Sequence, residues 1–493
     1  MSNYSKTISY LKRNGIKNTC CEIAERLDRI HLEEIQKKVA AYKGSRYFCE
    51  EKVRLMYASK AEPKHVQPEK ITDKPEFHKD FLFSILVPAY ETNPKHLREM
   101  LDSVVAQGIF ARVELIIADA GKSNQVEQIV KEYQKLSEEG KLAAQTEAAE
   151  SRKKEEKDEG GHVVIKYIRL KENRGISDNT NAALAQANGD YIGLLDHDDV
   201  LASDALFHVR QKLEEKDYEL LYSDEDKSDG KMKRFFQPHF KPDFNLDYLL
   251  TNNYICHFLV MKAELMKKLK FRWEHDGAQD YDIVLRAVGE LLFRGGGKEQ
   301  GKEKIAHIPK VLYHWRCHES STASNPESKR YAYEAGKHAL IDFMQTYMGL
   351  DSELASISHS KHLGFYQITY HPTIFQVRPE VAAICGRVVQ KGKVTEGPAW
   401  STEEGELSLF TGLRASYGGY MHRAETAMQV DVMPKGAIFW NKKYQELFKT
   451  MEKEGKRLSV QEKQKIAREK GDIFVYLPDF WEQVNGKLNE DLI

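Results

Sequence analysis

The sequence has no apolar run that approaches the roughly 18 residues of a membrane-spanning helix. Its first residues, MSNYSKTISYLKRNG, also lack the apolar core of a secretory signal, so we expect a cytoplasmic protein. An excess of one charge sign is absent as well, because 74 lysines and arginines face 75 aspartates and glutamates and leave a formal charge of -1. This balance provides no global basic field for nucleic acid or anionic lipid, and we expect no nucleic-acid partner.

Cysteine is scarce and scattered. The six cysteines include no C-x-x-C pair and no set with zinc spacing, which argues against a disulfide framework or a structural zinc site. We expect reduced thiols at Cys20, Cys21, Cys49, Cys256, Cys317 and Cys385. With 41% hydrophobic and 30% charged residues, the composition is that of a globular protein, and 493 residues leave room for two or three domains.

The N-terminal residues have a helical pattern of apolar side chains. Ile23, Leu27 and Ile30 illustrate the spacing, which predicts amphipathic helices within residues 1–60. The segment AEPKHVQPEKITDKPE, near residues 61–76, has three prolines and many charges without periodicity. It is typical of a surface linker, so we expect a domain to start after it.

A different pattern begins at Phe81. FLFSILVPAY is a continuous apolar run, which favours a strand that is buried on both faces, and HLREMLDSVVAQ behind it has helical spacing. VELIIADAG and NQVEQIVKEYQKL repeat this order. The alternation predicts an α/β fold with an open, mainly parallel sheet, helices on both faces, and ligands at the carboxyl ends of the strands.

The stretch at 137–161 interrupts the alternation with dense mixed charge and predicts a solvated excursion. The pattern then resumes with VVIKYIRL, ISDNTNAALAQA and DYIGLLD. A second, smaller α/β unit is indicated toward the C-terminus by strand-like pieces such as GFYQITY and GDIFVYLP.

The strongest local signal is LLDHDDVL, in which three carboxylates follow a buried strand. Asp196, Asp198 and Asp199 would repel one another there unless solvent or a cation compensates. Oxygen ligands suit Mg or Mn, which proteins hold with a few carboxylates plus substrate phosphates. The alternative is a helix cap, since Asp198 or Asp199 could serve a helix that begins near Ser203.

Two further sites are ambiguous from the residues alone. Asp280 and Asp282 lie at the start of an apparent helix in GAQDYDIVLRAVGE, where they either complement its dipole or provide a general base. His314 follows an apolar strand in VLYHWRCH and is either a metal or phosphate ligand or a structural histidine.

In combination, these pieces resemble the family 2 glycosyltransferases of the GT-A fold, and among them the bacterial rhamnosyltransferase-like enzymes of surface polysaccharide assembly. Eight stretches occur in the family's order over residues 80–345: FSILVPAYET, SVVAQ, VELIIADAGKS, NRGISDNTNAAL, ANGDYIGLLDHDDVL, LYSDEDK, AQDYDIVLR and VLYHWRCHESSTA. Each is weak alone, and their order and spacing make the resemblance specific.

The resemblance implies roles for individual residues. Asp280 matches the general base, and Asp198 matches the direct metal ligand of the D-x-D motif, with His314 completing the metal site in some relatives. Residues implied to contact the nucleotide sugar are Pro88, Ala89, Tyr90, Glu91, Asp119, Asn173, Gly175, Asn181, Asp196 and His197.

The sequence departs from the family pattern at two places. Family members often have a second acid after the one that matches Asp119, and this chain has Ala120 there, which leaves open whether the base is uracil or thymine. The acidic pair before the acceptor helix is here Gln279 and Asp280, so the first acid is replaced.

The implied organisation has three parts. Residues 1–78 form the helical region and linker, 79–345 the GT-A domain, and 346–493 an accessory α/β region that faintly resembles the rear half of a second such domain. No second D-x-D motif precedes that region. A non-catalytic remnant that serves acceptor binding or assembly is therefore expected.

The resemblance implies a function: metal-dependent, inverting transfer of a sugar from a UDP- or dTDP-sugar to a hydroxyl of a growing cell-surface glycan. The cofactor would be Mg or Mn. A lipid-linked acceptor, as in many relatives, implies peripheral contact with the inner face of the plasma membrane. The alternatives are a catalytically silent binding or scaffolding protein, which the two departures favour, and a nucleotidyltransferase, for which the sequence lacks the usual glycine-rich phosphate loop.

Overall fold

The computed structural model of the protein describes residues 77–139, 142, 163–233, 235–295, 297–317, 330–371, 373–402, 405–412, 414–416 and 418–483. The helices expected within residues 1–60, the linker at 61–76 and nearly all of the charged excursion at 137–161 lie outside these residues. The described chain divides into two compact units. The larger unit contains residues 77–244 and 252–366, and the smaller contains residues 245–251 and 367–483.

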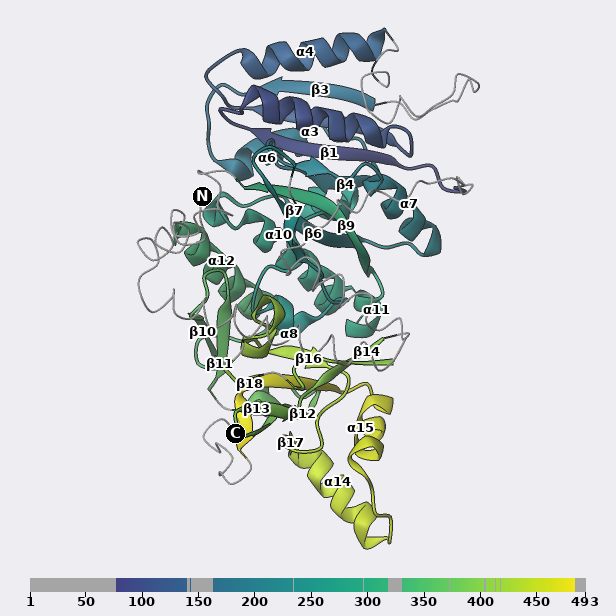
Figure 1. Ribbon diagram of the computed structural model, residues 1–493, viewed down its shortest axis with the longest axis vertical. Helices are drawn as coiled ribbons and strands as arrows, with labels where there is room; N and C mark the ends of the chain where they lie inside the picture. Colours follow the sequence, from purple (N-terminus) through teal and green to yellow (C-terminus); the bar gives the residue numbers. More distant parts are fainter. Residues whose placement is uncertain are drawn as a thin grey trace. The chain divides into compact units, whose positions relative to one another are not determined.

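A nine-stranded sheet forms the centre of the larger unit (Figure 1). The strand order is β3-β2-β1-β4-β8-β6-β9-β5, and β7 pairs with β6. The strands are β1 (Leu82–Ala89), β2 (Arg112–Asp119), β3 (Val163–Arg169), β4 (Tyr191–Leu194), β5 (Val200–Leu201), β6 (Leu220–Asp229), β7 (Phe235–His239), β8 (Leu259–Lys262) and β9 (Ile305–Cys317). Since β8, β5 and β7 alone run opposite to the others, the expected open, mainly parallel sheet is confirmed.

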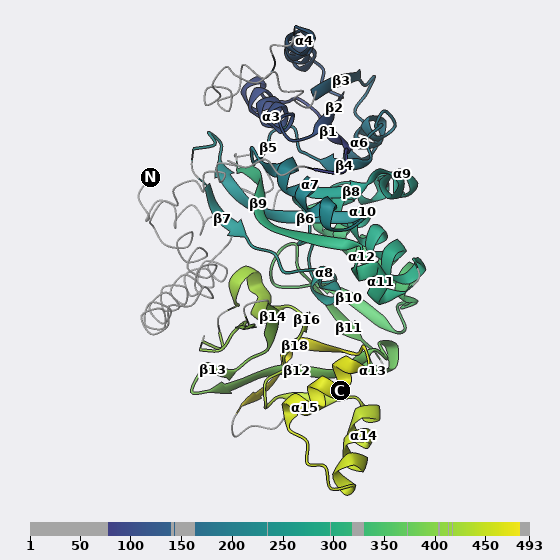
Figure 2. The same ribbon diagram turned by 90° about the vertical axis from the view of Figure 1, so that its right-hand side faces the viewer.

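Helices cover both faces of this sheet, as expected. Figure 2 shows α3 on one side of the strands and α6 and α9 on the other. The helices of this unit are α3 (Pro94–Gln107), α4 (Gln125–Glu138), α6 (Ile176–Leu184), α7 (Ala205–Glu215), α9 (Ala263–Leu269), η2 (Trp273–His275), α10 (Gln279–Gly289), η3 (Glu290–Arg294), α11 (Lys298–Lys302), α12 (Arg330–Phe343) and η5 (Met344–Met348). Strand β10 (Ala355–His359) follows, and β11 (Tyr366–Tyr370) begins where the unit ends.

The apolar run of β1 explains its central place. Phe83, Ile85 and Val87 pack in one core with Leu97 of α3, and all four side chains are fully buried. Leu86, which points to the opposite face of the strand, is also fully buried. A strand that is buried on both faces favours a nearly continuous run of apolar residues, which is the pattern that predicted β1.

The strand register brings the predicted site residues to one edge. Ala89 pairs with Asp119, so the ends of β1 and β2 are level. Leu86 pairs with Leu194, and Asp196 follows two residues later. The carboxyl ends of these parallel strands therefore meet at the same edge of the sheet, where ligands bind in open α/β folds.

The smaller unit has its own sheet, which confirms the expected smaller C-terminal α/β unit. Its order is β13-β12-β18-β16, with β17 paired to β12. The elements are α8 (Leu246–Leu249), α13 (Ile374–Val377), β12 (Val381–Gln390), β13 (Lys393–Glu396), β14 (Ala399–Thr402), β15 (Gly405–Ser408), η6 (Tyr420–Glu425), β16 (Met428–Val430), β17 (Ile438–Trp440), α14 (Lys442–Lys453), α15 (Val460–Glu469) and β18 (Ile473–Gln483). Among the described residues, no helix combines the length and the apolar character needed to cross a bilayer.

Residues 245–251 belong to the smaller unit although they lie between two strands of the larger one. Asn245 caps α8 through the amide of Tyr248 and also exchanges hydrogen bonds with the backbone of Gln429, at 2.9 and 3.0 Å. Asp247 forms an ion pair with Arg378 at 2.8 Å, and both side chains are buried. The smaller unit is therefore assembled from two separated stretches of the chain.

The Asp247–Arg378 pair gives a stability prediction. Asp247→Asn leaves the buried Arg378 guanidinium with Glu380 as its remaining carboxylate partner, so we expect a loss of about 3 kcal/mol in the free energy of unfolding. Denaturant unfolding followed by circular dichroism measures it. Lys465→Ala is the control, because Lys465 and Glu469 form an exposed pair at 3.9 Å, and we expect a change below about 1 kcal/mol. Equal, small losses in both variants would contradict the proposed importance of the buried pair.

Candidate functional site

An acidic turn connects β4 to β5 and contains Asp196, His197, Asp198 and Asp199. Asp196, His197 and Asp198 are partly exposed, whereas Asp199 is 1% exposed. Helix α7 begins at Ala205 with Asp204 at its N-cap position, so the alternative in which Asp198 or Asp199 caps that helix is wrong.

Buried side chains fix the turn from behind. Asp199 accepts hydrogen bonds from the Tyr313 hydroxyl and from the Arg316 backbone amide, both at 2.7 Å. Arg316 has no exposed surface, donates from Nε to the carbonyl of Asp198, and forms an ion pair with Glu99 at 2.7 Å. Burial raises the pKa of Asp199 well above its ordinary value, and the charges of Asp198 and Asp196 raise it further. These contacts hold Asp198 at the partly exposed side of the turn.

His314 lies beside this turn. His314, on β9, pairs with Val200 of β5, and the Nδ1 atom of its ring lies 2.6 Å from a carboxylate oxygen of Asp226 on β6. Both side chains are buried. Among the described residues, Asp198 and His314 are not part of a three-residue cluster of closely spaced metal ligands. The metal roles implied for Asp198 and His314 stay predictions.

Asp280 is in the first turn of α10, whose N-cap residue is Ala278. It is partly exposed, accepts a hydrogen bond from the Asn253 side chain at 3.1 Å, and approaches Cys256 and His257. Burial raises the pKa of the Cys256 thiol, and the charges of Asp280 and Glu225 raise it further. Asp280 thus has the exposure that a general base needs.

Asp280 contributes to the electrostatics of the acidic turn. Burial raises the pKa of Asp196, and the negative charges of Asp198 and Asp280 add to this effect, while His257 and His197 oppose it. Contacts connect the two: the His257 ring lies near Asp280 and stacks on Tyr313, whose hydroxyl donates to Asp199 of the turn.

His257 is a member of this site that sequence analysis missed. Its ring stacks on the ring of Tyr313, with centroids 4.6 Å apart, and lies edge-on to Trp315. Its charge lowers the pKa of Asp196, and its ring nitrogens are among the atoms close to Asp280. His257 therefore lies beside both Asp280 and the acidic turn, which are separated by more than 80 residues in the sequence.

A buried ion pair holds the segment that contains His257. Lys241 has no exposed side-chain surface and donates hydrogen bonds to the carbonyls of Ile255 and His257. Glu225 lies 3.6 Å from Lys241 and accepts from the backbone amide of His257. Burial would raise the pKa of Glu225, but Lys241, His239 and His257 lower it to about 2. Both polar ends of the His257 backbone are therefore fixed by buried charges.

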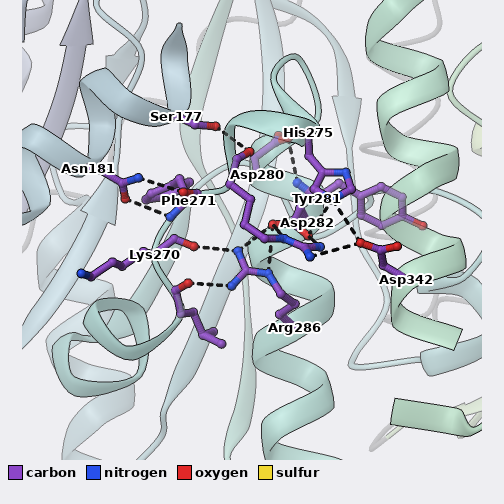
Figure 3. Close-up of polar contacts among 12 residues, drawn as sticks. Ser177, Asn181, Lys270, Phe271, His275, Asp280, Tyr281, Asp282, Arg286 and Asp342 are labelled. Atoms are coloured by element: carbon purple, nitrogen blue, oxygen red, sulfur yellow. Dashed lines mark hydrogen bonds and ion pairs between the residues drawn. The ribbon is translucent and has the colours of Figure 1, made fainter. Parts of the chain in front are cut away.

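A second network anchors the start of α10. Asp282 is 1% exposed and binds Arg272 and Arg286, and Arg286 also donates to the carbonyls of Leu269 and Lys270 (Figure 3). Burial would raise the pKa of Asp282, but these arginines lower it. Of the two acids in this helical turn, Asp282 is structural and Asp280 is the one available to a ligand.

The segment implied to cover the nucleotide sugar is held by local contacts. Gly175 has φ +105, and a Cβ there would lie 1.9 Å from Asp276, so glycine is required. Asn173 accepts from the Gly175 amide at 3.1 Å. Asn181 exchanges two hydrogen bonds with the backbone of Phe271 (Figure 3). These asparagines therefore have structural partners, and their contacts with a ligand stay predictions.

The ends of β1 and β2 form the other side of the predicted donor site. Tyr90 is 42% exposed, and Glu91 accepts from the backbone amide of Lys122 at 2.9 Å, next to Pro88 and Ala89. Asp119 is fully buried and accepts hydrogen bonds from the Gly121 amide at 2.8 Å, the Tyr167 hydroxyl at 2.8 Å and Arg169 at 3.0 Å. It orders the turn after β2, and its contact with a nucleotide base stays a prediction.

The chain is similar to known proteins over this unit. Residues 84–271 match the model of glycosyl transferase family 2. An uncharacterized protein of Sinorhizobium fredii, y4gI, is 36% identical over 266 residues, which are 53% of this chain and 25% of the relative. The O-antigen biosynthesis protein RfbC of Myxococcus xanthus is 28% identical over 308 residues, which are 61% and 21%. The chain thus spans a quarter or less of the length of these two relatives.

Among solved structures, S. aureus TarS 1–349 in complex with UDP-GlcNAc has 18% identity and a TM-score of 0.36, covering 55% of this chain and 73% of that one. The mannosyltransferase PcManGT from Pyrobaculum calidifontis, in complex with GDP-Man and Mn2+, has 14% identity and a TM-score of 0.35, covering 65% and 75%.

The Lys241–Glu225 pair generates a prediction about stability and pH. Lys241→Met leaves a buried carboxylate without its main cation, so we expect a loss of about 3–5 kcal/mol at neutral pH. The depressed pKa of Glu225 stabilises the native protein above its ordinary value of 4.5, and this contribution is lost as the pH falls toward 2. The loss in Lys241→Met should therefore shrink as the pH falls, as denaturant unfolding at several pH values will measure.

The double variant Glu225→Gln/Lys241→Met is the matched control. It removes both charges, so it should be more stable at neutral pH than Lys241→Met alone. If the double variant were as unstable as the single one at every pH, packing of the Lys241 side chain, and not charge, would explain the loss.

Proposed function

Since this chain carries a domain of glycosyl transferase family 2, we propose that it transfers a sugar from a nucleoside diphosphate sugar to a hydroxyl of a growing cell-surface glycan. The observation that carries the proposal is the contact path from Asp280 to the acidic turn: His257 lies beside Asp280, its ring stacks on Tyr313, and the Tyr313 hydroxyl donates to Asp199. Two carboxylates that can hold a cation and a third, partly exposed one that can accept a proton are the groups that this reaction requires.

The donor would lie along the carboxyl ends of β1, β2 and β4. The base and ribose would contact the segment from Pro88 to Glu91, next to the turn that Asp119 orders. The diphosphate would lie at the acidic turn. We propose a UDP- or dTDP-sugar, as the family resemblance implies. The partly exposed Tyr90 offers a flat surface for a base to stack on.

The acidic turn fits a divalent cation. Its donor atoms are carboxylate oxygens, which Mg and Mn prefer. Burial raises the pKa of Asp196, the charges of Asp198 and Asp280 raise it further, and a bound cation would oppose both effects. Asp198 would bind the cation directly, with Asp196 nearer the ribose and His314 beside the site. When bound, the cation would neutralise charge that develops on the diphosphate leaving group.

Asp280 would act as the general base. It would accept the proton of the acceptor hydroxyl as that oxygen forms a bond to the anomeric carbon and the bond to the diphosphate breaks on the opposite side. One displacement inverts the anomeric configuration. Asn253 and the anchored start of α10 would orient the Asp280 carboxylate for this step.

The product class and location are also proposals. RfbC is named for O-antigen biosynthesis, and its similarity to 61% of this chain supports surface polysaccharide as the product. If the acceptor is lipid-linked, the chain would meet the membrane peripherally, at its cytoplasmic face.

Asp198→Asn tests the donor site. The substitution removes one charge from the crowded turn, so the fold should persist while metal-dependent binding of the nucleoside diphosphate is lost. Isothermal titration calorimetry with UDP or dTDP in the presence of Mn or Mg measures it. Binding as tight as that of the wild type would refute the assignment of Asp198 to the metal site.

Asp280→Asn tests the base. Turnover of a labelled nucleotide sugar should fall by about 10²- to 10⁴-fold, because a general base contributes an effect of this size. Donor binding should stay at the wild-type level, since Asp280 would face the acceptor. Glu274→Gln is the matched control, because Glu274 is an exposed acid six residues earlier, and both properties should be unchanged. A silent binding protein would instead show donor binding without release of diphosphate in any variant.

A further inference from the structure

Three side chains of the site offer a set of ligand atoms that differs from the acidic turn. The Cys256 sulfur, a ring nitrogen of His257 and a carboxylate oxygen of Asp280 all lie within 4.8 Å of one another. The sulfur is 2.8 Å from Nδ1 of His257. Cys256 is 6% exposed, while His257 and Asp280 are partly exposed. One sulfur, one nitrogen and one oxygen donor therefore lie close together, and two of the three residues are partly exposed.

This donor set selects a different class of metal from the acidic turn. Zinc is bound by cysteine sulfur, histidine nitrogen and carboxylate oxygen, and open zinc sites have three protein ligands and one exchangeable position. Sulfur ligands favour such thiophilic ions, whereas Mg and Mn favour oxygen alone. The two neighbouring ligand sets can therefore discriminate between cations.

The ligands are held in place before any ion arrives. Buried Lys241 and Glu225 fix the backbone on either side of Cys256, the Tyr313 ring fixes the plane of His257, and Asn253 binds the Asp280 carboxylate. A preformed cluster avoids most of the ordering cost that flexible ligands impose on binding.

We propose that Cys256, His257 and Asp280 bind a thiophilic divalent cation of the zinc class, and that this ion inhibits the enzyme by occupying the carboxylate of Asp280. Binding forms one metal–sulfur, one metal–nitrogen and one metal–oxygen bond and releases the thiol proton to solvent. The inhibition rests on the proposed function, since it requires Asp280 to be the base, whereas the binding does not.

The test of binding uses Co²⁺ as the probe on the full chain, because a cobalt–thiolate bond gives a near-ultraviolet charge-transfer band that nitrogen and oxygen ligands do not give. We expect the band in the wild type and its loss in Cys256→Ser. Cys317→Ser and the triple variant C20S/C21S/C49S are controls that should retain it. A band that persists in Cys256→Ser, or one that is absent from the wild type at millimolar Co²⁺, would overturn the proposal.

Asp280→Asn and His257→Ala keep the proposal testable if Cys256→Ser folds poorly. Each removes one ligand, so the dissociation constant for Co²⁺ should rise by about tenfold or more. An unchanged constant in both variants would also overturn the site.

The inhibition is measured as the ratio of each variant's own turnover with and without Zn²⁺, at saturating Mg. Zinc should lower the wild-type rate, and Cys256→Ser should be less sensitive. Calorimetric binding of the nucleoside diphosphate in the same samples separates the two proposals. Donor binding and turnover without a cobalt band refute the metal site alone, while a band without donor binding or turnover refutes the proposed function alone.

Discussion

Repulsion among carboxylates is the constraint on which the site depends. Burial raises the pKa values of Asp196 and Asp199, and neighbouring carboxylates add to this effect: Asp198 and Asp280 for Asp196, and Asp198 and Asp196 for Asp199. Such a cluster is unstable without compensation. Here the compensation comes from behind the turn. Tyr313 and Arg316 bind the innermost carboxylate, Asp199, and the outer ones remain partly exposed. The arrangement leaves the outer carboxylates accessible to the cation and to the acceptor proton that we propose they bind.

Buried lysine and arginine side chains compensate carboxylates in the same way elsewhere in the larger unit. Lys241 neutralises Glu225 beneath the His257 segment, and Arg272 and Arg286 neutralise Asp282 at the start of α10. In each case a charged pair fixes backbone next to a catalytic candidate. Removing one partner of a buried pair is costly, so these pairs specify geometry strongly even where their net contribution to stability is small.

Much of this arrangement was predictable from local sequence. Continuous apolar runs predicted β1 and β2, and the position of Asp196 directly after a strand predicted its place at the sheet edge. His257, Lys241 and Arg316 were not predictable in the same way. Their roles depend on partners that are far away in sequence, such as Glu225 for His257, 32 residues earlier, and Asp198 for Arg316, 118 residues earlier. No periodicity or motif in a single sequence reports such pairs.

The residues alone could not separate Asp280 from Asp282, although the family resemblance assigned the base to Asp280. Both occupy the first turn of one helix, and only the arginines that converge on Asp282 distinguish them. The same limit applies to α8, because a short segment between two strands of one unit gives no local sign that it belongs to the other unit.

The placement of α8 has a consequence for synthesis of the chain. Asp247 can form its ion pair only after Arg378, which is 131 residues further on, has been synthesised. At about 5–20 residues per second, this delay is roughly 7–26 s, during which the apolar face of α8 and the Asp247 carboxylate have no native partner from the smaller unit. During part of this time β9 of the larger unit is also still being made. The larger unit must therefore form while residues 245–251 still lack their native partners.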